Sequence, residues 1–147
     1  IVKSKYHNRL HYEDKEKSEQ AYRLAARGEF NLSSAMYYND QPPQMMYYSA
    51  KAIEALGDKD EAKKRFNAFI EYANNHMNDE MKIDYFAVSL PDFLIFEGDL
   101  NKNNKVHCNL MAALGYLGIG DNDNAQKYAK QGLELNQCHA ELRDIVK

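Results

Sequence analysis

Two pairs of adjacent metal-binding residue types lie in the last third of the chain. His107 is followed by Cys108, and Cys138 is followed by His139. Histidine and cysteine are the ligands that zinc prefers, and each pair falls near the start of an expected helix. Adjacent residues of a helix point about 100° apart, so both members of a pair seldom reach one ion. We therefore expect a buried cysteine and a hydrogen-bonded histidine rather than a zinc site or a disulfide.

Carboxylates and aromatic rings are mixed in residues 84–99, which read DYFAVSLPDFLIFEGD. Paired acids in an aromatic-walled pocket are the equipment for binding or hydrolysing a sugar. However, Asp92 follows Pro91 and Asp99 precedes an expected helix, so turn and N-cap roles account for both. We keep Asp92 as a candidate ligand-binding residue and expect no catalysis by this chain alone.

A polar loop rich in tyrosine precedes the first strongly periodic segment. It contains Tyr37, Tyr38, Asn39 and Asp40, and Tyr47 follows on the next expected helix. Tyrosine rings stack on ligands and loop amides hydrogen-bond to them, so these five residues are candidates for binding a sugar or a peptide. The alternative is structural, with the loop starting a helix and its tyrosines covering the end of a helical stack.

The overall charge argues against nucleic acid and membrane partners. The 147 residues include 19 Lys and Arg against 22 Asp and Glu, a formal charge of -3. The basic run within 59–65 is interleaved with acids and is typical of a solvated helix face. No apolar run approaches the roughly 18 residues that cross a bilayer. We expect no cofactor, and reduced thiols in a cytoplasmic setting.

The spacing of apolar residues predicts an all-α chain. Apolar residues recur at intervals of three and four, which predicts one helical hairpin over about 43–76 and another over about 100–136. A weaker hairpin is expected over about 3–28 and the start of a capping helix over 138–147. Together these elements predict a single domain built as a stack of helical hairpins.

An apolar insert, residues 77–99, separates the two strong hairpins. Burying each of its large apolar side chains would contribute about 1.5–3 kcal/mol. A structureless loop of that length is improbable in a compact domain. We therefore expect an ordered wedge between the two hairpins, packed against the first helix of each.

The two hairpins resemble tetratricopeptide repeats. Ala50 and Ala113 match the small residue of the first helix, a Gly-Asp turn follows in each, and Ala62 and Ala125 match the Ala of the second helix. The resemblance implies an α-α superhelix that binds other polypeptides. The usual Trp and the closing Pro of the repeat are missing.

Three further strings are similar to the C-terminal helical part of an uncharacterised bacterial family. They are YYNDQPPQMMYY (37–48), IDYFAVSLPDFLIFEGDLNKNN (83–104) and VHCNLMAALGYLGIGD (106–121). In that family a β-sandwich resembling galactose mutarotase precedes tetratricopeptide repeats. The resemblance implies an upstream domain of a carbohydrate-binding type. Members often have a second His where this chain has Asn109, which weakens the idea of a metal site.

These observations lead to two functional hypotheses. The first is a non-catalytic docking module for the upstream domain of the same chain or for another protein, with a groove bordered by the insert and by the loop 37–43. The second is a carbohydrate site completed with the upstream β-domain, in which Asp92, Tyr38 and Asp40 supply polar contacts. Because the chain opens at Ile1 without Met or a signal peptide, we expect it to be a fragment of a longer protein.

Overall fold

A computed structural model of the chain describes residues 15–33, 41–81 and 99–146. All regular secondary structure in these ranges is helical, and they contain no strand. In chain order the helices are α2 (Lys15–Ala25), α3 (Pro43–Ala55), α4 (Lys59–His76), α5 (Leu100–Ile119), α6 (Asn122–Leu135) and α7 (Ala140–Val146). The prediction of an all-α helical stack is confirmed over this part of the chain.

Three helices begin at an aspartate that caps them. The side chains of Asp58, Asp99 and Asp121 accept hydrogen bonds from backbone N–H groups at 3.0, 3.0 and 3.1 Å. Each bond satisfies one of the donors that a helix N-terminus leaves free. The two hairpin turns contain Gly57 and Gly120, whose φ angles of 104° and 85° favour glycine. The predicted N-cap role of Asp99 is confirmed.

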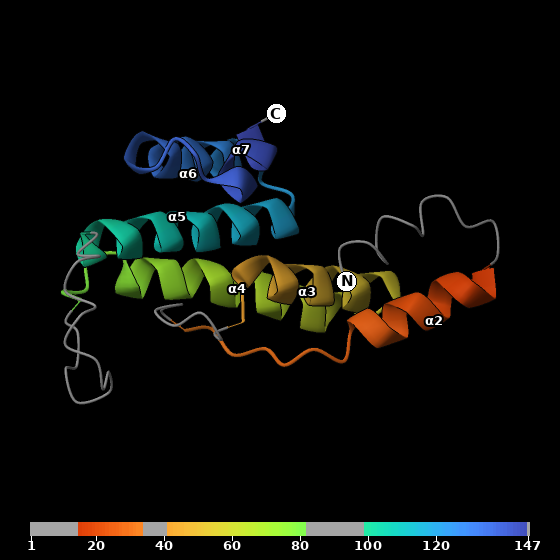
Figure 1. Ribbon diagram of the computed structural model, residues 1–147. Coiled ribbons are helices and arrows are strands. Elements are labelled where there is room, and N and C mark those ends of the chain that lie inside the picture. Colours follow the sequence, from red (N-terminus) through yellow and green to blue (C-terminus); the bar gives the residue numbers. More distant parts are fainter. Residues whose placement is uncertain (1–14, 34–40, 82–98, 147) are drawn as a thin grey trace, which may run out of the picture.

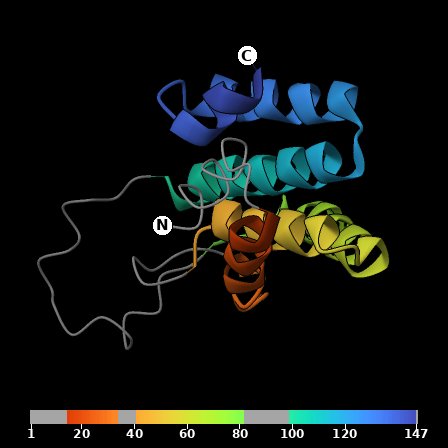
Figure 2. The same ribbon diagram turned by 90° about the vertical axis from the view of Figure 1, so that its right-hand side faces the viewer.

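The helices lie in layers, with α5 in the middle. Figures 1 and 2 both show α3 and α4 on one side of α5, and α6 and α7 on the other. α4 and α5 meet at a glycine seam, where a Cβ on Gly115 would lie 2.7 Å from the Phe66 carbonyl oxygen. A Cβ on Gly118 would lie 2.2 Å from the Phe66 ring. Contact this close requires glycine on α5.

The expected wedge between the two hairpins stays a prediction. α4 and α5 touch directly at Gly115, in the part of the chain that the structure describes. Residues 82–98, which hold most of the insert, lie outside the described residues, and so does the first half of the hairpin expected over 3–28.

The first and last described helices, α2 and α7, pack against the rest of the stack in different ways. At one end α7 buries Leu142 completely, and Gln44 Nε2 at the start of α3 donates to Glu141 Oε1 at 3.0 Å. At the other end Tyr22 and Ala25 of α2 form a small cluster with Ala52 of α3, separate from the main core. No helix in the described ranges is long and apolar enough to cross a membrane.

Candidate functional site

Most of the predicted ligand-binding residues lie outside the described part of the chain. These are Tyr37, Tyr38, Asn39, Asp40 and Asp92. Tyr47 is described, and its side chain is only 9% exposed. Its ring packs at 5.4 Å from Tyr48 and at 5.7 Å from Phe66, measured between centroids. A place in the core explains this tyrosine without a ligand.

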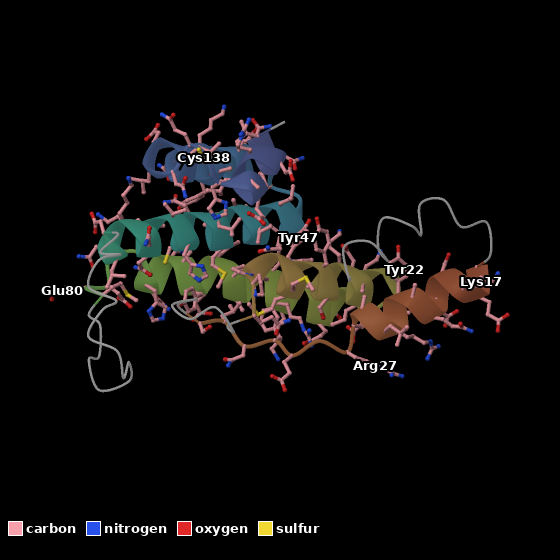
Figure 3. All side chains as sticks on the ribbon, in the orientation of Figure 1. Lys17, Tyr22, Arg27, Tyr47, Glu80 and Cys138 are labelled. Carbon is pink, nitrogen blue, oxygen red and sulfur yellow. The ribbon has the colours of Figure 1, made fainter. Side chains whose placement is uncertain are left out.

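The two His-Cys pairs serve separate contacts. His107 Nε2 lies 2.8 Å from the Ser33 carbonyl oxygen, and Cys108 is fully buried. This confirms the expected buried cysteine and hydrogen-bonded histidine for the first pair. Cys138 is exposed, which corrects the expectation for the second pair, and both thiols are free. Figure 3 places Cys138 in the layer of α6 and α7.

His139 lies close to an acidic side chain without a hydrogen bond to it. Its Nδ1 is 3.3 Å from Glu141 Oε2 and has no hydrogen-bond partner in the described structure. Nowhere in ranges 15–33, 41–81 and 99–146 do three His, Cys, Asp or Glu side chains gather closely enough to hold a metal ion.

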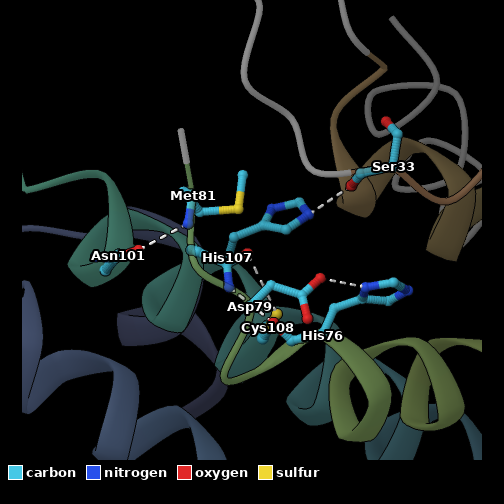
Figure 4. A network of polar contacts seen from close by, with 8 residues as sticks. Ser33, His76, Asp79, Met81, Asn101, His107 and Cys108 are labelled. Atoms are coloured by element: carbon cyan, nitrogen blue, oxygen red, sulfur yellow. Dashed lines mark hydrogen bonds and ion pairs between the residues drawn. The ribbon is translucent and has the colours of Figure 1, made fainter. Parts of the chain in front are cut away.

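A polar cluster holds the end of α4 against the start of α5 (Figure 4). Asn104 Nδ2 donates to the His76 carbonyl oxygen at 2.7 Å, and His76 Nδ1 lies 2.6 Å from Asp79 Oδ2. The Met81 N–H donates to Asn101 Oδ1 at 2.8 Å. These bonds fix the two chain segments on either side of residues 82–98.

Burial raises the pKa of Cys108 and of Tyr72, which lie beside this cluster. It raises the pKa of the Cys108 thiol to about 11, and the nearby Asp79 carboxylate adds to the effect. Burial also raises the pKa of Tyr72 to about 12, with Cys108 and Asp79 contributing. A thiol with a pKa this high stays protonated at neutral pH and is a poor nucleophile. The cluster is therefore suited to holding the helices together and not to cysteine chemistry.

A groove of about 470 Å³ lies where α4 ends beside α5 and α6. Four amide side chains, two opposite charges and three less polar side chains line it. They are Asn74, Asn78, Asn109 and Gln131; Lys105 and Glu134; and Met77, Tyr128 and Leu135. We call this the amide groove. Since its two charges are opposite, it offers no net attraction for an ion.

Asn109 is the buried member of the amide groove. It is 5% exposed, and its Nδ2 donates to the Lys105 carbonyl oxygen at 2.8 Å and approaches Met77 Sδ at 3.8 Å. Its Oδ1 is buried and accepts no hydrogen bond in the described structure. Leaving a buried acceptor unmatched costs about 1–3 kcal/mol. An unmatched atom of this kind is a reason to look for a ligand.

Close packing between α5 and α6 forms the wall beside Asn109. Tyr128 of α6 stacks on Tyr116 of α5, with ring centroids 5.4 Å apart and planes 10° apart. Lys127 Nζ lies 5.7 Å from the centroid of the Tyr128 ring. A Cβ on Gly132 would lie 3.2 Å from Asn109 Cβ, so α6 approaches α5 closely at this point. Burial, with Tyr128 and Asp121, raises the pKa of Tyr116.

A second hollow of about 440 Å³ lies between the segment after α2 and α4. Its central cation is already partnered. Arg65 Nε donates to Glu61 Oε1 at 2.8 Å, and the guanidinium lies 5.1 Å from the Phe30 ring centroid. These contacts account for the position of Arg65 within the fold, so the amide groove is the stronger candidate site.

Comparison with known proteins assigns no family and no fold relative to this chain. No protein-family model matches the chain, and no solved structure matches it significantly. The resemblance to tetratricopeptide repeats, and to the bacterial family with a mutarotase-like domain, therefore stays a prediction.

Sequence reasoning did not find the amide groove. Its one usable signal was a polar residue on a buried helix face, since Asn109 lies among Val106, Leu110 and Ala113, all buried. The remaining lining residues are exposed or half-buried positions on α4, α5 and α6 or directly after α4, and their types are ordinary for a solvated surface. Only the packing of α4, α5 and α6 brings them together.

Proposed function

We propose that this chain is a non-catalytic docking module that binds an extended polypeptide segment in the amide groove. The observation that carries the proposal is the unmatched acceptor of Asn109 in a groove lined with amides. A polypeptide backbone offers donors and acceptors in alternation, and side-chain amides offer both. A groove with balanced charge and several amides is therefore matched to a neutral backbone.

The segment belongs to the upstream domain of the same chain or to another protein. Helical stacks commonly present binding surfaces to polypeptides, because their layers create long surfaces on a stable core. The protonated Cys108 thiol and the contact between the His107 ring and the Ser33 carbonyl oxygen favour a binding role over catalysis.

A tetratricopeptide-like architecture is part of the proposal. α3 with α4, and α5 with α6, are successive hairpins whose Gly-Asp turns precede a capped helix. Ala50 and Ala113 are buried in the first helices, as are Ala62 and Ala125 in the second helices. Buried small residues at matching places support a repeated hairpin.

A peptide array tests the docking role. The labelled chain is applied to short peptides of varied sequence, alongside Gln131→Ala and Asn78→Ala, which shorten exposed groove residues without touching the core. Gln126→Ala is the matched control, since Gln126 is an exposed amide of α6 that does not line the groove. We expect a set of peptides whose binding falls in both groove variants and persists in the control. Binding that is equal in all four proteins, or no binding at all, would refute the proposal.

A carbohydrate is the second candidate ligand. The same amides and the phenol of Tyr128 are groups that hydrogen-bond to sugar hydroxyls. A glycan array probed with the same variants separates the two functions. Sugar binding lost in Gln131→Ala, or in Asp92→Ala and Tyr38→Ala, would favour the carbohydrate hypothesis over docking.

A further inference from the structure

The Asn109 amide has a fixed orientation. Its Nδ2 donates to the Lys105 carbonyl oxygen at 2.8 Å. Exchanging Nδ2 and Oδ1 would place two acceptors at that distance, which is repulsive. The unmatched atom is therefore the oxygen, and the partner that it needs is a hydrogen-bond donor.

A neutral donor suits the Asn109 oxygen best. The Asn109 side chain carries no charge and is 5% exposed, so a cation bound to it would be desolvated without an opposite charge on the amide. Glu134 and Lys105 are exposed and lie at the rim of the groove. A backbone N–H satisfies the Asn109 oxygen without this electrostatic penalty.

Met77 is the adaptable side chain at this point. Asn109 Oδ1 has almost no surface in contact with solvent, so a donor reaches it only when a neighbour moves. Met77 lines the groove with its Sδ 3.8 Å from Asn109 Nδ2, and it is half-buried. Methionine is unbranched and changes rotamer easily, whereas Tyr128 is held in a stack with Tyr116.

We propose that Asn109 is the peptide-group receptor of the amide groove. Met77 swings aside, and Asn109 Oδ1 accepts a hydrogen bond from a backbone N–H of the bound segment. This inference rests on the proposed docking function and names the bond that selects the ligand.

Two small amides test the inference on the unaltered chain. N-methylacetamide has one N–H donor, whereas N,N-dimethylacetamide has the same carbonyl and no donor. Each is titrated while the side-chain resonances of Asn109 and Gln126 are followed by NMR. We expect N-methylacetamide to shift the Asn109 resonance saturably, with an affinity about tenfold or more above that of N,N-dimethylacetamide, and the Gln126 control to stay unchanged. Equal effects of the two probes would overturn the inference.

The variant Asn109→Leu separates a binding role from a structural one. If the Asn109 oxygen serves a ligand, replacing the amide by an apolar side chain removes an unmatched buried acceptor. The Tm of the free protein should then rise, and the response to N-methylacetamide should disappear. A lowered Tm with an unchanged N-methylacetamide response at the neighbouring Gln131 would overturn the inference, because the oxygen would then serve the fold through a buried water.

The outcomes distinguish this inference from the proposed function. Array peptides that need Gln131 but bind equally well to Asn109→Leu would leave docking intact and refute the role of Asn109. A response to methyl galactoside but not to N-methylacetamide would also refute it, in favour of a sugar hydroxyl as the donor. The absence of both peptide binding and probe response would refute docking and the inference together.

Discussion

At the residue scale, two neighbours on α5 show how far sequence reasoning reaches. Cys108 and Asn109 share a helix turn, and both are buried. Burial of the cysteine could be predicted, because cysteine on an apolar helix face usually behaves as a small hydrophobic residue. The role of Asn109 could not be predicted, because its unmatched oxygen depends on the positions of Lys105, Met77 and α6 in the folded chain.

The raised pKa of Cys108 predicts that the folded chain loses stability at alkaline pH. Its pKa rises from 9.0 to about 11 on folding, so the folded chain holds this proton more tightly than the unfolded chain. The stabilisation is complete below pH 9 and is lost as the pH rises towards 11. Urea unfolding as a function of pH measures this slope. We expect Cys108→Ala to reduce the fall between pH 9 and 11.

The exposed cysteine provides the control for this experiment. Cys138→Ala alters a free thiol on the surface, so the pH slope of its stability should match that of the unaltered chain. An equal slope in Cys108→Ala would contradict the assignment of the effect to the buried thiol. Tyr72, whose pKa is raised to about 12, adds a further loss at higher pH in all three proteins.

At the element scale, helix limits were predictable because local chemistry sets them. The aspartates before α4, α5 and α6 and the glycines of the two turns act through neighbouring atoms. The direct seam between α4 and α5 was not predicted, because the apolar content of 84–97 suggested a wedge there. Gly115 and Gly118 allow this close approach, but their role is evident only in the structure, where Phe66 lies opposite them.

Asp99→Ala should shorten or loosen the start of α5. The substitution removes the bond to the Lys102 N–H and should lower the free energy of unfolding by about 1 kcal/mol. Asp99→Asn keeps an acceptor at the same place and should retain most of the stability. Equal losses in both variants would show that the negative charge, and not the cap, stabilises this helix end.

Gly115→Ala tests the seam between α4 and α5. A Cβ at this position would lie 2.7 Å from a backbone oxygen and from Ile70 Cγ1, so α4 must shift. We expect a loss of about 1–3 kcal/mol despite the higher helix propensity of alanine. Gln126→Ala, at an exposed helical position, should change stability by less than about 0.5 kcal/mol. A Gly115→Ala protein as stable as the control would contradict the close approach.

At the scale of the whole molecule, α5 connects the two sides of the stack. Its glycine seam faces α4, and Asn109 and Tyr116 face α6. The amide groove follows from this arrangement, because it lies where the end of α4 and the surface of α6 meet beside α5. Sequence patterns predicted the helices and their order, but a site shared by three helices depends on the angles between them.

The capping helix α7 should contribute to the stability of the whole stack. Leu142 is fully buried, and its Cδ1 lies 2.6 Å from the position of a Cβ on Gly132. We expect Leu142→Ala to lower the free energy of unfolding by about 2–5 kcal/mol. Ile145→Ala, at a half-buried position of the same helix, is the comparison and should cost less. A single unfolding transition in both variants would indicate that α7 unfolds together with the stack.

The central claim is that the amide groove binds an extended polypeptide, and NMR mapping of a bound array peptide tests it most directly. We predict that titrating the peptide into the labelled chain shifts the side-chain resonances of Asn78, Asn109 and Gln131 together, and leaves Gln126 unchanged. Shifts that gather instead around Arg65 and Phe30, in the second hollow, or that avoid all three amides, would contradict the claim.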